Sequence, residues 1–388
     1  ALVAPGPPPC AGTLAAGEGG EFRQDPPGRG GRAYRMIIYD SSSWLTLFKI
    51  KGSVFPKAAW IALFSAAIAC VLKYVEQQEG GFSVTEYKLI TQNTGFSYFT
   101  SSVAFVLIFR TNQCYSRFWH CARSVSTMRA LMVEAASSLV TFSIMSKKSK
   151  EEVQIFRHTM VRLFSMLHAM CLSTFCDREA GFALIDVDVF DQKELHNRLH
   201  SADHRERVDV VYMWINALII RSLDNGLLNV PPPILSRVLQ EMEKAMVEFH
   251  QIMQVMEIPF PFPYAQMAIV LLFLMSVGTP VAMCYWTDNV VSCGVLTFMS
   301  VLCLASLELI ADELDNPFGT DENDLPCEHF QEQMNASLIL LLTPGFGTVP
   351  LLTEEALQNL DGCLKRMETI EDLETMIGAD STDAEPGL

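Results

Sequence analysis

The sequence lacks the motifs that nucleotide, redox and zinc chemistry require. It contains no glycine-rich phosphate loop, no Cys-x-x-Cys pair, and no serine, histidine and aspartate in a catalytic order. Its eleven cysteines are scattered, several of them inside apolar runs, which predicts reduced, buried thiols and not a disulfide framework. These absences argue against an enzyme, so we expect no catalytic residue and no required cofactor.

Charge is also scarce, because only 19% of the 388 residues are charged while 50% are hydrophobic. The net charge is −16, and the acidic balance argues against nucleic acid as a partner. Residues 1–35 are rich in glycine and proline and are predicted to be disordered. Residues 353–388 form an acidic tail, which leaves 36–352 as the predicted folded domain.

Four apolar segments approach the roughly 20 residues that a bilayer core requires. They are predicted at about 54–75, 93–109, 264–285 and 290–310. Between the second and the third, apolar residues recur at three- and four-residue spacings, which predicts a helical body outside the membrane. Basic residues before the first span and after the second place this body on the cytosol-like side. The expected fold is an all-α membrane protein with four transmembrane helices per subunit and a helical cytosolic-side body.

The second predicted span carries the most distinctive pattern. Its residues Ser97, Ser101, Phe105 and Phe109 are spaced four apart and draw one stripe along a helix, polar in its first half and aromatic in its second. Arg110 follows at once, so the span is expected to emerge into a basic, aqueous vestibule. On periodicity alone, a helix that packs its aromatics against lipid or neighbouring helices is the more usual explanation.

A second pattern precedes the third span, where three prolines alternate with two phenylalanines between Pro259 and Pro263. Prolines at alternate positions exclude a continuous helix. The segment is therefore predicted to be an extended strut that presents Phe260 and Phe262. A structural hinge that only redirects the chain is the alternative.

Three segments together resemble one family. The run from Phe109 to Gln113, followed by Tyr115, Arg117, Phe118 and Trp119, resembles the signature segment of the bestrophin family of anion channels. The segments 258–266 and 315–324 resemble two further family segments, and each lies beside the expected span. The resemblance covers about 44–352 and is to the bacterial and plant-algal types.

This resemblance implies a homopentamer in a lipid bilayer, with the second span lining a central pore. The pore neck would consist of Ser101, Phe105 and Phe109, where Ser101 departs from the usual aliphatic residue. Phe260 would form a cytosolic aperture, with Phe262 as the near alternative. The expected function is passive conduction of chloride or another small monovalent anion, such as bicarbonate.

Two other functions stay open at this point. A secondary anion transporter would need a charged site within the membrane, for which Glu308 is the one candidate. A membrane-anchored helical scaffold would use the spans only as a tether. Plant and algal members of the family lie in chloroplast membranes, including thylakoids, and animal members in the plasma membrane, so both locations stay open.

The resemblance also implies a metal site. In calcium-gated family members, the segment after the last span binds calcium through carboxylates at positions matching Asp321 and Asp324, beside Asn316. Oxygen ligands of this kind suit calcium as a structural or gating ion. Thr320 replaces an acid here, and a solvated turn that caps the next helix is the alternative.

Overall fold

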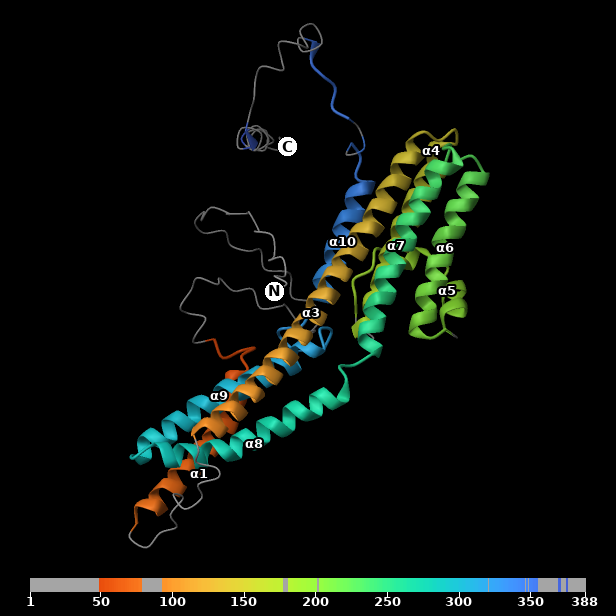
Figure 1. The fold of residues 1–388 in the computed structure, drawn as a ribbon. Helices are drawn as coiled ribbons and strands as arrows, with labels where there is room; N and C mark the ends of the chain where they lie inside the picture. The colour runs from red at the N-terminus through yellow and green to blue at the C-terminus, as the bar shows by residue number, and fades with distance from the viewer. Residues whose placement is uncertain are drawn as a thin grey trace. The chain divides into compact units, whose positions relative to one another are not determined.

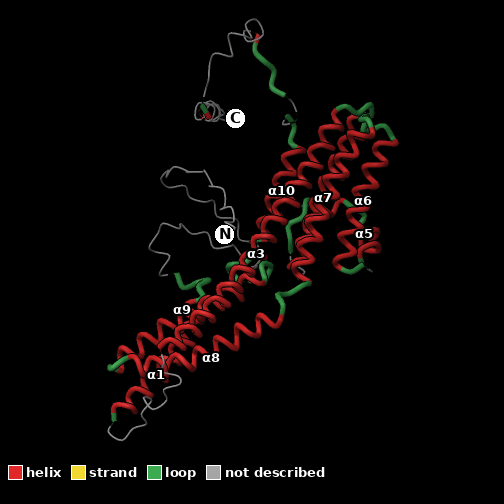
Figure 2. The backbone as a smooth tube through the Cα atoms, in the orientation of Figure 1, coloured by secondary structure: helices red, strands yellow, loops and turns green. Residues whose placement is uncertain are grey.

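The computed structural model describes residues 49–78, 93–176, 181–200, 202–319, 321–345, 347, 349–354, 369, 370 and 375. The chain divides into two compact units, Ala1–Ala33 and Tyr34–Leu388, and every described residue belongs to the second. Within the described ranges the regular structure is helical, without a strand (Figure 2). The predicted disordered segment 1–35 and most of the predicted acidic tail lie outside the described residues.

The helices follow one another along the chain as Figure 1 labels them. Their bounds are α1 (Phe55–Gln77), α3 (Asn93–Ile144), α4 (Lys150–Cys176), the 3-10 helix η3 (Val187–Val189), α5 (Gln192–Leu199), α6 (His204–Asp224), α7 (Pro232–Glu257), α8 (Phe262–Trp286), α9 (Val290–Asp315) and α10 (Cys327–Leu342).

One helix, α3, belongs to two groups of helices. It has 52 residues, no proline, and Gly95 near its start as its one glycine, so nothing in its sequence interrupts it. At 1.5 Å per residue it measures about 78 Å, more than twice the thickness of a bilayer core. Its first half packs against α8 and α9, and its second half against α4, α7 and α10.

The membrane bundle consists of α1, the first half of α3, α8 and α9, and within it α8 and α9 each contact all the others. Small side chains fill its interfaces. On α1 the buried positions include Ala58, Ala62 and Ala69, while Trp60 and Phe64 on the same helix are exposed. Small residues at three- and four-residue spacings allow two helix backbones to approach closely.

The helical body consists of the second half of α3 together with α4, α5, α6, α7 and α10. Its core contains large side chains, among them the fully buried Phe164 and Phe249. Helix α6 begins with a capping box, in which the Asp203 and Glu206 side chains each bond to the other residue's backbone. The body is thus built like the core of a water-soluble helical protein.

Hydropathy identifies a different set of spans from the predicted one. By length and composition, the described helices that could cross a membrane are α1, α4, α8 and α9. Helices α1, α8 and α9 contain three of the predicted spans, but the predicted span 93–109 lies in α3, which does not qualify. Serines and threonines in the first half of α3 lower its hydropathy.

Burial inside the helical body explains why α4 is apolar enough to resemble a membrane span. Its apolar window is 67% buried by other helices, against 33% for the windows of α1 and α8. Its apolar residues therefore face the core of the helical body, whereas those of α1 and α8 are largely free for lipid. We accordingly count α4 with the body and the first half of α3 with the membrane bundle.

Candidate functional site

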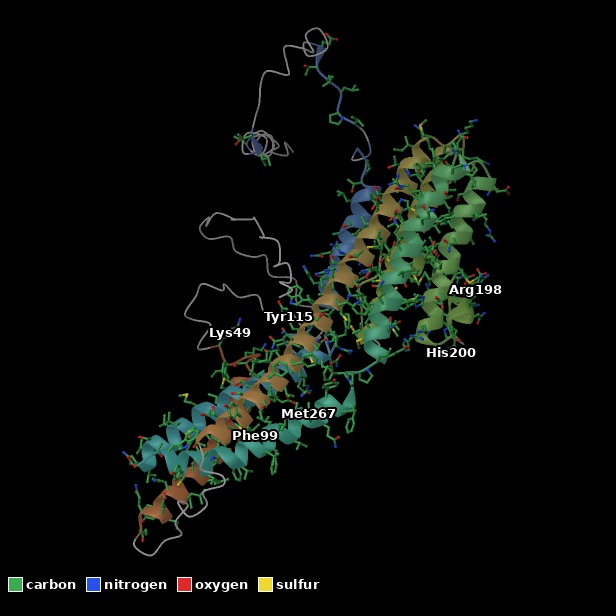
Figure 3. The ribbon with its side chains drawn as sticks, viewed as in Figure 1. Lys49, Phe99, Tyr115, Arg198, His200 and Met267 are labelled. Carbon is green, nitrogen blue, oxygen red and sulfur yellow. The ribbon has the colours of Figure 1, made fainter. Side chains whose placement is uncertain are left out.

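The predicted stripe lies along the exposed side of α3. Ser97 and Ser101 are exposed, the Phe105 side chain is 71% exposed and that of Phe109 is 41% exposed. The opposite side of the same helix is buried and packs against α8 and α9. Figure 3 labels Phe99 and Tyr115 on α3, on either side of the two phenylalanines. The structure thus leaves one polar and aromatic face of α3 largely exposed in the described part of the chain.

Serine hydroxyls on this face are satisfied within the helix. Ser101 Oγ donates a hydrogen bond to the carbonyl of Ser97 at 2.9 Å, and Ser102 Oγ donates to that of Tyr98 at 2.9 Å. This bonding pattern lets a helix carry serines in an apolar environment. The exposed serines therefore do not need a neighbouring helix to satisfy them.

An aromatic contact joins the two predicted constrictions. The ring of Tyr264 lies 6.0 Å from that of Phe109 and 6.0 Å from that of Phe260, measured between centroids. Offset or tilted rings at this separation attract one another. Tyr264 thus links α3 to the start of α8, a role that its position in the sequence did not reveal.

The predicted strut is shorter than expected. Helix α8 already begins at Phe262, with Pro261 as its N-cap and Pro263 in its first turn. Proline is tolerated there because the first backbone N–H groups of a helix have no partner within it. The prediction that Phe262 lies on an extended strut was therefore wrong. Phe260 alone lies in the non-helical link, where it is half-buried, and Phe262 is 71% exposed in the first turn.

Arg117 fixes this link to α3. Its guanidinium donates hydrogen bonds to the carbonyls of Val255 at 2.9 Å and Ile258 at 3.0 Å, at the C-terminal end of α7. Its Nε also lies 3.3 Å from a carboxylate oxygen of Asp315, at the end of α9. The last carbonyls of a helix lack partners and carry partial negative charge, so an arginine is well suited to them. One side chain thereby ties α3, α7 and α9 together beside Phe260.

A buried ion pair lies directly after the predicted neck. Arg110 on α3 contacts the Glu308 carboxylate on α9, and Asp312 lies 3.8 Å from the same guanidinium. Arg110 and Glu308 are both buried, and Arg110 Nε and Glu308 Oε2 have no hydrogen-bond partner among the described residues. Glu308, the single acid noted within the last predicted span, is thus neutralised by Arg110, which follows the second predicted span.

Cys114 lies between these two arginines on the buried side of α3. Burial raises the pKa of its thiol to about 11, and the negative charge of Asp315 adds to the rise. Burial likewise raises the pKa of Cys121 to about 11. Both thiols stay protonated at neutral pH, as expected of unreactive structural cysteines.

The acidic segment after α9 forms a compact turn. The Asp321 N–H donates to Asp324 Oδ2 at 2.6 Å, and the Leu325 N–H donates to the Pro317 carbonyl at 2.9 Å. A Cβ at position 319 would lie 2.8 Å from Asp324 Oδ2, so a larger residue than Gly319 would displace the Asp324 side chain. These bonds fold the segment back toward the start of α10.

Two contacts anchor the turn to the rest of the chain. The ring of Phe318 is buried and lies 5.2 Å from that of Phe175 in the core of the helical body. Asn323 donates to the carbonyl of Gly52 at 2.8 Å, just before α1. The turn therefore connects the body to the beginning of the membrane bundle.

The donor chemistry of this turn suits a hard cation, and one of its carboxylates is already used within the turn. Asn316 is the C-cap of α9, Asp321 is exposed, and one oxygen of Asp324 already accepts the backbone bond. Among the residues that the structure describes, no group of three or more histidine, cysteine, aspartate or glutamate side chains is arranged to hold a metal. Of the three predicted residues, Asp324 has a side-chain bond within the turn.

Comparisons with known proteins place these features in a family. A family model described as Bacterial/Fungal Bestrophin protein matches residues 36–339. A voltage-dependent anion channel-forming protein of Synechocystis sp. is 24% identical over 298 residues, which cover 75% of this chain and 89% of the relative. Another protein of the same description, from Salmonella typhi, is 24% identical over 304 residues, covering 76% and 90% of the two chains.

Solved structures share the fold. The crystal structure of a bacterial bestrophin homologue from Klebsiella pneumoniae has a TM-score of 0.58 and 15% sequence identity, and the match covers 76% of this chain and 99% of that one. A mutant of the same homologue has a TM-score of 0.59 and 16% identity, covering 75% and 99%. At this identity the likeness concerns the fold alone.

Proposed function

Because the chain belongs to the bestrophin family, we propose that it is an integral membrane channel that conducts anions passively. Chloride or another small monovalent anion, such as bicarbonate, is the proposed permeant ion. Two relatives that span three quarters of this chain are described as voltage-dependent anion channel-forming proteins, which supports this function. The observation that carries the proposal is the exposed face of α3 with Ser101, Phe105 and Phe109, of which only Phe109 has an aromatic contact with another described helix, through Tyr264.

Five copies of the chain would surround one pore, with these faces directed inward. Two rings of phenylalanines then form a dry constriction, which stops ions when it is narrow and passes them when it widens. The edge of an aromatic ring carries positive partial charge. Rings that turn their edges to the pore favour anions over cations, and the Ser101 ring makes the outer end of the neck more polar.

Phe260 forms the second constriction in this proposal. Tyr264 contacts both Phe260 and Phe109, and Arg117 holds the link that carries Phe260. A movement of α3 at the neck would therefore be transmitted to the aperture through these side chains. Phe262 is the less favoured residue for the aperture, because it belongs to the first turn of α8.

The two other functions predict different fluxes. A secondary transporter needs a charged group free to bind its substrate or coupling ion, but Glu308 is already paired with Arg110. Purified protein in liposomes separates the three cases. A channel conducts anions down their gradient with no coupling-ion gradient, a carrier shows saturable coupled flux, and a scaffold shows neither.

The neck is tested by replacing Phe105 with alanine in the same liposomes. Widening the dry constriction should raise the basal anion current. Phe64→Ala on α1 is the matched control, since its side chain is also 71% exposed but lies on a different helix. Equal currents from the Phe105→Ala and Phe64→Ala variants would show that Phe105 does not line the pore.

Calcium at Asn316, Asp321 and Asp324 is a separate proposal, supported by the oxygen ligands that this turn contains. It predicts that calcium shifts the unfolding temperature or the current of the wild-type channel, and that the chelator EGTA reverses the shift. The Asp321→Asn and Asp324→Asn double variant should lose this response. An identical response to magnesium, or none at all, would favour a turn held by its own hydrogen bonds.

A further inference from the structure

The helical body contains a cavity that the pore does not use. Its volume is about 450 Å³, and it lies between α4, α5 and α6. This size falls within the range of small-molecule sites in proteins, roughly 300 to 1,000 Å³. None of the predicted neck, aperture or acidic-turn residues lines it.

The floor and one wall of the cavity are apolar. Leu163 and Met166 of α4 are buried at its base, while the half-buried Trp214 and Leu218 of α6 form a wall. A recess lined in this way favours the flat or branched apolar part of a ligand. Trp214 in particular offers a large rigid surface.

The charged residues at the rim are not equivalent. Asp191 caps α5 by accepting from the backbone N–H groups of Lys193 and Glu194, and the Glu194 carboxylate pairs with Arg198 at 2.5 Å. Figure 3 labels Arg198 on α5. Both acids and one arginine are thus engaged in local contacts.

Arg221 is the remaining charged group. Among the described residues its guanidinium has no hydrogen-bond or ion-pair partner, although it lines the cavity. An arginine in the last turn of a helix is favourable to the helix dipole, which accounts for its presence in α6. The dipole does not account for an apolar recess beside it.

From this arrangement we infer that the cavity is a binding site for a small amphipathic organic anion. The apolar part of the ligand rests on Leu163, Met166 and Trp214, and its carboxylate or sulfonate pairs with Arg221. A planar guanidinium binds such groups through two parallel hydrogen bonds. The site is independent of ion conduction.

Two probes of the same shape test the inference. Binding of 2-naphthoate and of uncharged 2-naphthamide to the full chain in lipid nanodiscs is measured by calorimetry, with empty nanodiscs as the blank. The naphthoate should bind with a dissociation constant of about 1 mM or tighter, as expected for a ligand of this size. The amide should bind about tenfold more weakly, because it lacks the charge-assisted pair.

Three variants locate the binding. Arg221→Gln should weaken naphthoate binding about tenfold and leave amide binding unchanged. Arg237→Gln, at another exposed arginine outside the lining, should leave both unchanged. Ala217→Trp places a large ring in the cavity from an exposed lining position, so it should abolish binding of both probes without disturbing the buried core.

Each contrary result overturns the inference. Equal affinities for the two probes, or an Arg221→Gln variant with unchanged naphthoate affinity, would show that the arginine recognises no anion. The absence of saturable binding at millimolar concentration would mean that the cavity is closed in the assembled protein. Because binding is read by heat and not by current, these results are separable from a failure of the channel proposal.

Discussion

The membrane bundle and the helical body differ in the side chains that their helices bury. Helix α1 in the bundle buries alanines and exposes Trp60 and Phe64, whereas α4 in the body buries Phe156, Phe164 and Phe175. In water, a large apolar side chain is stabilised by burial. In lipid that gain is absent, and close backbone packing between small residues holds helices together instead. The kind of side chain that is buried therefore indicates lipid around the membrane bundle and water around the helical body.

Helix α3 experiences both environments along one continuous backbone. Its first half keeps an exposed face with Phe105, while its second half buries Met128, Met132 and Leu139 in the body. A rigid helix that extends from the membrane bundle into a solid core can transmit movement between them. The following variants test this comparison between bundle and body, from the largest expected change in unfolding free energy to the smallest.

The largest expected effect comes from the core of the body. Phe164→Ala should lower the free energy of unfolding by about 4 kcal/mol, because it removes a fully buried ring and leaves a cavity. Phe64→Ala, on the exposed side of the bundle, should change it by less than about 1 kcal/mol in detergent. Denaturant titration of both variants measures the difference. Similar losses of stability in the two variants would contradict the conclusion that the bundle faces lipid and the body faces water.

The ion pair between α3 and α9 should give the next effect. Arg110→Met alone, or Glu308→Leu alone, should cost about 3 kcal/mol, because each leaves a buried charge without its closest partner. The double variant should regain most of that stability, since the pair is incompletely hydrogen-bonded. A double-mutant cycle measures the coupling. Additive losses would place the two charges in water and not against each other.

Small residues in the bundle interface should give a smaller effect. Ala62 on α1 is fully buried, so Ala62→Leu should cost about 2 kcal/mol by forcing α1 away from its neighbours. Ala67→Leu, at an exposed position on the same helix, should be close to neutral. Thermal unfolding in detergent compares the two variants. Equal shifts in unfolding temperature would show that α1 presents a different face to its neighbours.

Helix caps should give the smallest effect and sharpen the same comparison. Asp203→Ala removes the capping box of α6 and should cost about 1 kcal/mol. Asn289→Ala removes the bond that Asn289 accepts from the Val291 N–H at the start of α9, and should cost about 0.5 kcal/mol. The same unfolding assay measures both. A larger loss at Asn289 would mean that α9 starts in lipid and not at its surface.

Much of this architecture could be predicted from uncharged runs and spacing. The runs of α1, α8 and α9 and the stripe from Ser97 to Phe109 are local properties, and the structure places them as helices. Hydropathy alone did not select α3, because a helix with a polar face is less apolar than a buried core helix such as α4. Hydropathy does not show which neighbouring helices cover each helix, and this information was missing.

Contacts between distant segments were the part that could not be predicted. Arg110 and Glu308 each stood out as a lone charge beside or within a span, but nothing local showed that they meet. Tyr264 was hidden inside a proline-rich segment, and the helical start at Phe262 was missed because prolines are compatible with a first turn. The cavity at Arg221 depends on three helices and has no signature in any one of them.

The central claim is that the exposed face of α3 lines the path of the anions. It is tested most directly by the reversal potential of Ser101→Glu channels under a potassium chloride gradient, with Ser101→Ala beside them. An acidic ring at the neck should shift the reversal potential toward that of potassium, and the alanine variant should keep the wild-type value. A Ser101→Glu channel with unchanged reversal potential and conductance would contradict the claim.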